Sequence, residues 1–164
     1  MEDWRRGIPP AAPESLSAGM AEVIEKPAAK VDPARIMQMV DKARWAAASY
    51  ATYPRDSVDA IVAAVARAAA AEARRYAQWA VEETGFGVVE HKELKNRLCS
   101  EGIRDHYAAS NFVDYAIDAA TKTVAIPKPA GVIFALTPST NPVSSVFFKA
   151  IIALMTRNAI IFSP

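Results

Sequence analysis

The stretch GVIFALTPSTNPVSSVFFKAIIALMTRNAIIFSP, residues 131–164, decides the fold of this chain. It begins with an apolar run, Val132–Leu136, followed by a polar loop, residues 137–141. Apolar residues then recur at helical spacing over Pro142–Met155, and a second apolar run covers residues 159–162. Run length and β-branched content predict strand, loop, helix and strand. Because a crossover helix joins parallel strands, we expect one βαβ unit of a doubly wound α/β sheet, its strands buried on both faces.

The loop of this unit is the natural place for a ligand, since ligands of such sheets lie at the carboxyl ends of the strands. Asn141 and Pro142 have a purely structural explanation, because Asn is a favoured N-cap and Pro a favoured first helical residue. Alternatively, the Asn141 amide donates to an oxyanion beside the free N–H groups of the helix start. The pattern by itself favours the structural explanation.

Composition limits the classes of function. The chain has 164 residues, of which 52% are hydrophobic and 23% charged, and a formal net charge of +1. This is a globular composition, and the near-neutral charge argues against nucleic-acid or membrane partners. No stretch is long and apolar enough to span a membrane, and no secretory signal opens the sequence. One cysteine excludes an internal disulfide framework and predicts a cytoplasmic protein.

Helices are predicted before this unit. The first starts at Asp32-Pro33 and ends before Pro54, and the second is capped by Asp56 or Ser57. We expect that second segment to break near Ala71-Glu72 and to stop at Gly85. The alanine-rich faces predict a closely packed helical layer.

A third helical region is predicted over residues 88–117. Cys99 lies within it near arginines, which can lower a thiol pKa, but a lone helical cysteine without a partnered base favours a packing role. His91 and His106 are predicted to be solvated surface residues, and no metal site is expected.

Two further segments complete the pattern. Residues 121–127 alternate polar and apolar side chains and predict an edge strand. Residues 1–31 are rich in proline and alanine and predict a disordered tail with a short transient amphipathic helix. The alternative for this helix is a docking peptide.

Five motifs stand out along residues 43–164. They are Pro138-Ser139-Thr140-Asn141-Pro142, Lys149 after two aromatic residues, Thr156-Arg157-Asn158-Ala159-Ile160-Ile161-Phe162-Ser163-Pro164, Glu83-Thr84-Gly85-Phe86-Gly87 and Glu93-Leu94-Lys95-Asn96. These motifs resemble the aldehyde dehydrogenase superfamily, and above all its CoA-acylating branch, which includes the aldehyde-dehydrogenase half of bifunctional alcohol/aldehyde dehydrogenases.

This resemblance implies NAD(P)-dependent oxidation of a short aldehyde to its acyl-CoA by a homo-oligomer, with coenzyme A as co-substrate. Asn141 matches the asparagine whose amide stabilises the tetrahedral oxyanion. Ser163 stands where many non-acylating members have a lysine that holds the adenosine ribose, and Lys149 is assigned no role. The residues that match the loop lining the cofactor cleft are Leu136, Thr137, Pro138 and Ser139.

The resemblance also implies that residues 32–164 are the N-terminal part of the cofactor-binding domain, because the nucleophilic cysteine, the general acid/base and the second domain would follow Pro164. Some similar enzymes carry an N-terminal peptide that targets them to bacterial microcompartments, although no motif supports this here. The alternative function is a non-catalytic binding or scaffold domain that retains the half-fold.

Overall fold

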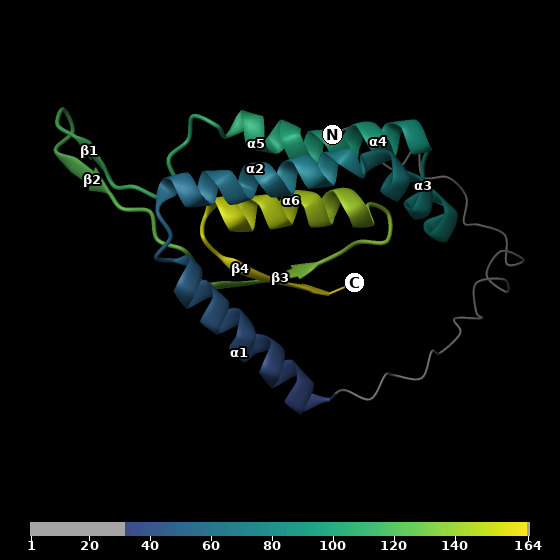
Figure 1. The fold of residues 1–164 in the computed structure, drawn as a ribbon, viewed down its shortest axis with the longest axis horizontal. Helices are drawn as coiled ribbons and strands as arrows, with labels where there is room; N and C mark the ends of the chain where they lie inside the picture. The colour runs from purple at the N-terminus through teal and green to yellow at the C-terminus, as the bar shows by residue number, and fades with distance from the viewer. Residues whose placement is uncertain (1–31, 164) are drawn as a thin grey trace, which may run out of the picture. The chain divides into compact units, whose positions relative to one another are not determined.

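The computed structural model describes residues 32–163, and Figure 1 shows their helices and strands. α1 (Pro33–Tyr50) begins at the predicted proline. α2 (Arg55–Ala71) begins earlier than predicted, so the caps proposed at Asp56 or Ser57 are wrong. Pro54 holds the N-cap position in an extended conformation without a side-chain cap, and Asp56 instead lies in the first turn, where a negative charge favours the helix dipole.

The break between α2 and α3 (Ala73–Thr84) falls at Glu72, as predicted from the change in the apolar stripe. The predicted stop at Gly85 is also confirmed. Gly85 adopts a left-handed conformation with φ 69°, and its N–H donates to the carbonyl of Val81 at 2.8 Å. This is the usual glycine end of a helix.

The third helical region is shorter than predicted. It consists of α4 (Val89–Arg97), a π-helical turn η3 (Leu98–Gly102) and α5 (Ile103–His106). The prediction of helix as far as residue 117 is wrong, because the Asn111 side-chain oxygen accepts hydrogen bonds from the N–H groups of Val113 (3.2 Å) and Asp114 (2.9 Å). Such an Asx turn competes with the helix and redirects the backbone.

The chain then forms a hairpin of β1 (Ala116–Asp118) and β2 (Thr123–Ala125), paired antiparallel. β2 lies within the predicted strand, whereas β1 was predicted as helix. All six strand residues are exposed. Figure 1 shows the hairpin extending away from the helices of the described chain.

The predicted βαβ unit is present as β3 (Val132–Leu136), α6 (Pro142–Met155) and β4 (Ala159–Ser163). β3 and β4 are parallel, and Val132 pairs with Ala159. The α/β fold class is therefore confirmed. Burial on both faces is not, because Phe134 and Leu136 are 65% and 64% exposed, and Ala135 is the only buried residue of β3.

The hydrophobic core lies between α2 and α6, and Figure 1 shows α6 between α2 and the β3–β4 pair. Its buried side chains come from these two helices. They are Val58, Val62, Ala66, Ile151 and Met155. This packing fixes α6, and with it the loop that precedes the helix.

Arg157 connects three distant segments at the turn between α6 and β4. Its guanidinium donates hydrogen bonds to the carbonyls of Ala51 (2.8 Å), Pro127 (3.2 Å) and Val113 (3.4 Å). The residue itself adopts φ 56°, an uncommon conformation for a residue other than glycine. The side chain therefore ties the segments that enter and leave the β1–β2 hairpin, at Val113 and Pro127, to Ala51 at the end of α1.

Two sequence predictions concern the limits of this description. The tail predicted over residues 1–31 lies outside the described residues. Among the helices of residues 32–163, none has the length and apolar character needed to cross a membrane.

Candidate functional site

The carboxyl ends of β3 and β4 form one edge of the sheet. Leu136 and Ser163 are register partners there, and the Thr137 N–H donates to the Ser163 carbonyl at 2.9 Å. The Lys149 ammonium donates a short hydrogen bond to the Leu136 carbonyl and so ties α6 to the end of β3. The structure thus brings together Leu136 and Thr137, two of the residues predicted to line the cofactor cleft, with Ser163, which was matched to the position of the ribose-holding lysine. The other two predicted residues of the cleft, Pro138 and Ser139, lie exposed after them.

Asn141 occupies the N-cap position of α6, and Pro142 is the first helical residue. The Asn141 backbone adopts φ −142° and ψ 57°, and its N–H donates to the Pro138 carbonyl at 3.3 Å. Its side chain makes no capping hydrogen bond to the helix. The Asn-Pro pair therefore starts the helix, but the side-chain amide is engaged elsewhere.

Two lysines of α4 contact this loop. The Lys92 ammonium donates to the Thr140 carbonyl at 2.9 Å, and the Lys95 ammonium donates to the Asn141 Oδ1 at 2.5 Å. The Asn141 Nδ2 has a longer contact, 3.4 Å, with the Thr140 Oγ1. Sequence analysis did not identify either lysine as part of the site. The available signal was their three-residue spacing, which puts them on one face of a helix.

The environment of Lys92 is unusual for a lysine, because its side chain is buried. Burial lowers the pKa of the Lys92 ammonium, and the nearby charge of Lys95 lowers it further. Neither lysine forms an ion pair with a carboxylate among the residues that the structure describes. Within residues 32–163, positive charge therefore lies next to the loop amide without a carboxylate partner.

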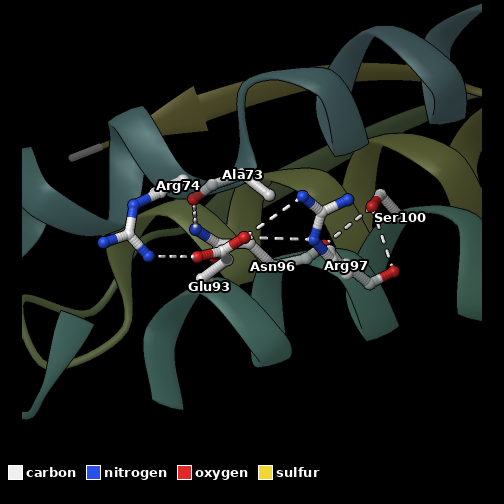
Figure 2. Close-up of polar contacts among 6 residues, drawn as sticks. All are labelled: Ala73, Arg74, Glu93, Asn96, Arg97 and Ser100. Atoms are coloured by element: carbon white, nitrogen blue, oxygen red, sulfur yellow. Dashed lines mark hydrogen bonds and ion pairs between the residues drawn. The ribbon is translucent and has the colours of Figure 1, made fainter. Parts of the chain in front are cut away.

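A polar network fixes α4 on α3, as Figure 2 shows. The buried Asn96 amide donates to the Ala73 carbonyl at 2.9 Å. Glu93 accepts from Arg74 of α3 at 2.9 Å and from Arg97 of its own helix at 3.1 Å. These two hydrogen bonds lower the pKa of the Glu93 carboxyl. The helix that carries both lysines is thereby held in one position.

The start of α6 also borders an open apolar cavity of about 310 Å³. Tyr76 and Phe147 contribute its aromatic part, with their ring centroids 6.2 Å apart in an edge-to-face arrangement. The other lining residues are Thr137, Pro142, Val143 and Val146. A small apolar group bound here would lie beside the loop that ends at Asn141.

Other candidate residues are outside this site. Burial raises the pKa of the Cys99 thiol, which opposes the thiolate form needed by a nucleophile. His91 and His106 are exposed, as predicted. No group of metal-ligating side chains gathers anywhere in residues 32–163.

Comparison with known proteins identifies the class. Residues 14–164 match the model of the aldehyde dehydrogenase family, and the chain therefore belongs to that family. It is 39% identical over 132 residues to the bifunctional aldehyde-alcohol dehydrogenase of Escherichia coli (strain K12), which covers 80% of this chain and 15% of that relative. The chain is also 35% identical over 130 residues to the succinate-semialdehyde dehydrogenase (acetylating) of Clostridium kluyveri. That alignment covers 79% of this chain and 29% of the relative.

Solved structures agree with this assignment. An acetylating aldehyde dehydrogenase from Geobacillus thermoglucosidasius matches with a TM-score of 0.75 and 38% identity, over 79% of this chain and 29% of that one. An engineered glycolyl-CoA reductase with bound NADP+ matches with a TM-score of 0.62, 30% identity and coverage of 79% and 29%. The propionaldehyde dehydrogenase of Rhodopseudomonas palustris with bound propionyl-CoA also matches with a TM-score of 0.62 and 30% identity, covering 79% and 28%. The predicted likeness to the acylating branch is confirmed, and the chain spans less than a third of each of these proteins.

Proposed function

We propose that this chain supplies the oxyanion-binding loop and one wall of the cofactor cleft of a CoA-acylating aldehyde dehydrogenase. The reaction is the NAD(P)-dependent oxidation of a short aldehyde to its acyl-CoA. The observation that carries the proposal is the Asn141 side chain, which stands at the start of α6 without capping it. Its amide oxygen is held by Lys95, whereas its amide nitrogen has only a long contact, 3.4 Å, with the Thr140 Oγ1 and can donate to a ligand at the carboxyl edge of the sheet.

The role of Asn141 follows from the charge that develops on the substrate. Attack of a thiolate on the aldehyde carbonyl turns a neutral oxygen into an oxyanion. An amide N–H aimed at that oxygen strengthens its hydrogen bond as the charge appears, which lowers the barrier rather than only tightening binding. Cys99 does not suit the attacking role, because burial raises the pKa of its thiol. The proposal therefore assigns the thiol to polypeptide that corresponds to the remaining length of the relatives.

The cofactor assignment rests on the carboxyl edge of the sheet. When bound, NAD(P) would accept the hydride of the aldehyde carbon. Leu136, Thr137 and Ser163 meet at this edge, and the Leu136 side chain is largely exposed. These residues fit a cofactor held mainly through backbone and apolar contact, and Pro138 and Ser139 extend the same wall. The family membership and the neighbours with bound NADP+ and propionyl-CoA support NAD(P) and coenzyme A as the ligands.

The cavity beside Tyr76 and Phe147 suggests where the substrate lies. Its walls are predominantly apolar, and Thr137 and Pro142 join it to the loop. We assign it to the short chain of the aldehyde, with the carbonyl directed toward Asn141.

We also place the enzyme in the cytoplasm as a homo-oligomer, following the single cysteine and the family resemblance.

The test is Asn141→Ala in the enzyme expressed from its complete reading frame. We expect kcat to fall by about 10²–10³-fold, the usual cost of one oxyanion donor, while the Kd for NAD is unchanged. Gln78→Ala, which removes an exposed amide from α3, is the control and should retain parental kcat. Mass spectrometry should show acyl-CoA as the main product. If Asn141→Ala keeps the parental kcat, Asn141 only starts the helix and the oxyanion role is wrong. If the parental protein does not oxidise aldehydes, the non-catalytic alternative is favoured.

A further inference from the structure

We propose that Lys95 and Lys92 are positioning residues for Asn141, Lys95 by fixing the orientation of its side-chain amide and Lys92 by fixing the loop backbone. This inference rests on the proposed oxyanion role of Asn141. It adds two residues of a different helix to the site, and it explains how a half-buried loop amide holds one direction.

The first step is the chemistry of the Lys95–Asn141 contact. An ammonium has three donors and no acceptor, so the amide atom that faces it must be the oxygen. The distance between the Lys95 Nζ and the Asn141 Oδ1 is 2.5 Å. With the oxygen held in this way, the nitrogen points to the opposite side of the amide. An amide without such a partner can turn over and present its oxygen, which would repel an oxyanion.

The second step is the freedom of the amide nitrogen. The Asn141 Nδ2 contacts the Thr140 Oγ1 at 3.4 Å, a long distance for a hydrogen bond. The Nδ2 group carries two hydrogens, so at least one of them has no strong acceptor in the described part of the chain. Lys95 therefore engages the acceptor end of the amide and leaves its donor end for the substrate.

The third step is the loop backbone. Lys92 is only 7% exposed and donates to the carbonyl of Thr140, the residue before Asn141. Gly87 makes room for the Lys92 side chain, because a Cβ at that position would lie 3.1 Å from the Lys92 Cε. Gly87 also has φ 82°, a conformation that favours glycine. The turn before α4 is thus shaped to let Lys92 reach the loop.

The fourth step is the rigidity of the helix that carries both lysines. Lys92, Lys95 and Asn96 are spaced three and four residues apart, so they share one face of α4. Asn96 anchors that face to the Ala73 carbonyl, and Figure 2 shows Glu93 bridging the two helices beside it. A continuous set of contacts therefore leads from α3 through α4 to the loop. The two ammonium charges, which have no carboxylate partner within residues 32–163, also favour an oxyanion near the amide.

A double-mutant cycle tests this inference in the enzyme expressed from its complete reading frame. The variants are Lys95→Met, Asn141→Ala and the pair together, with Lys95→Arg as the conservative replacement. Lys128→Met removes an exposed lysine from the segment before β3, at the opposite end of that strand from the loop, and is the control. For each protein, kcat, KM for the aldehyde, the Kd for NAD and the melting temperature are measured.

We expect Lys95→Met to lower kcat by about 10- to 100-fold, the scale of a misplaced reacting group, with unchanged NAD binding and melting temperature. The same substitution should have little further effect when Asn141 is already alanine, because its action passes through that amide. Lys95→Arg should recover most of the loss, since a guanidinium also donates to the oxygen. Lys92→Met should also lower kcat, and because Lys92 is buried this substitution should lower the melting temperature as well.

The outcomes separate this inference from the proposed function. If Asn141→Ala lowers kcat but Lys95→Met does not, the proposed function stands and the positioning role is wrong. If the two losses multiply, Lys95 acts independently of Asn141 and the positioning role is again wrong. If Asn141→Ala retains parental kcat, the oxyanion role fails, and the positioning role falls with it.

Discussion

Replacing Arg157 should release the β1–β2 hairpin. The guanidinium holds the carbonyls of Pro127 and Val113, which lie on the two sides of the hairpin, and that of Ala51 at the end of α1. The hairpin has no buried strand residue of its own, and an isolated two-stranded hairpin is marginally stable. Its order therefore depends on this anchor. Arg157→Asn is the cleanest change, because asparagine tolerates the left-handed backbone at this position.

The size of the effect follows from the contacts. Hydrogen bonds from a charged donor contribute about 1.5–3 kcal/mol each, and two of the three distances, 2.8 and 3.2 Å, are good. The buried Nε of Arg157 has no partner in the described chain, and such a group costs about 1–3 kcal/mol. The middle of these ranges gives a net contribution to anchoring of about 2.5 kcal/mol. Since 1.4 kcal/mol corresponds to a factor of ten, local opening should rise about 60-fold.

Hydrogen–deuterium exchange followed by mass spectrometry measures this opening directly, because amide exchange reports local unfolding. Peptides covering residues 114–127 should exchange faster in Arg157→Asn, while those of α2 and α6 should keep parental rates. Arg67→Gln changes an exposed arginine on α2 and is the control. Parental exchange in the hairpin of Arg157→Asn would show that its order does not come from the Arg157 contacts.

Further predictions concern the core, the α3–α4 network and the thiol. Ile151→Ala should destabilise the fold by about 2–5 kcal/mol, measured by urea unfolding, because the side chain is fully buried; a loss below 1 kcal/mol would contradict this. The arginine partners of Glu93 lower the pKa of its carboxyl, so Glu93→Gln should reduce the melting temperature at pH 7. The difference in melting temperature should vanish as the pH falls below 4.5, the ordinary pKa of a glutamate, and the parental carboxyl becomes protonated. An undiminished difference at pH 3 would exclude that origin. Iodoacetamide should label Cys99 more slowly than a free thiol at pH 8, because burial raises its pKa; equal rates would oppose a buried thiol.

Sequence patterns predicted most of the βαβ unit because its signals are local. The two apolar runs, the Asn-Pro start and the polar turn after Met155 each favour the same structure that the chain adopts. The hairpin was only half predicted, since the Asx turn at Asn111 overrides a helical pattern that continues through Phe112. The exposed face at Phe134 could not be predicted, because an apolar strand sequence does not specify what covers it.

The part of the site that has a local sequence signal was also predictable. Asn141 stands in a recognisable loop, and its motif pointed to an oxyanion role that stays a prediction. Lys92 and Lys95 were missed, because lysines on an amphipathic helix are usually solvated and only the tertiary packing of α4 turns them toward the loop. Nothing in their local sequence shows that one of them is buried.

The π-helical turn η3 has a consequence for the lengths that this protein can tolerate. A π turn holds one residue more than the α-helix that would otherwise connect α4 to α5. Removing a single residue between Leu98 and Gly102 would convert it to α-helix and leave both flanking helices facing as they do now. A one-residue deletion between Val58 and Val62 in α2 would rotate the rest of that helix by about 100° relative to Val58 and turn Val62 and Ala66 away from the core. Natural length variation in the helical part of the chain should therefore collect at η3, and an engineered deletion there is the one most compatible with an intact loop at Asn141.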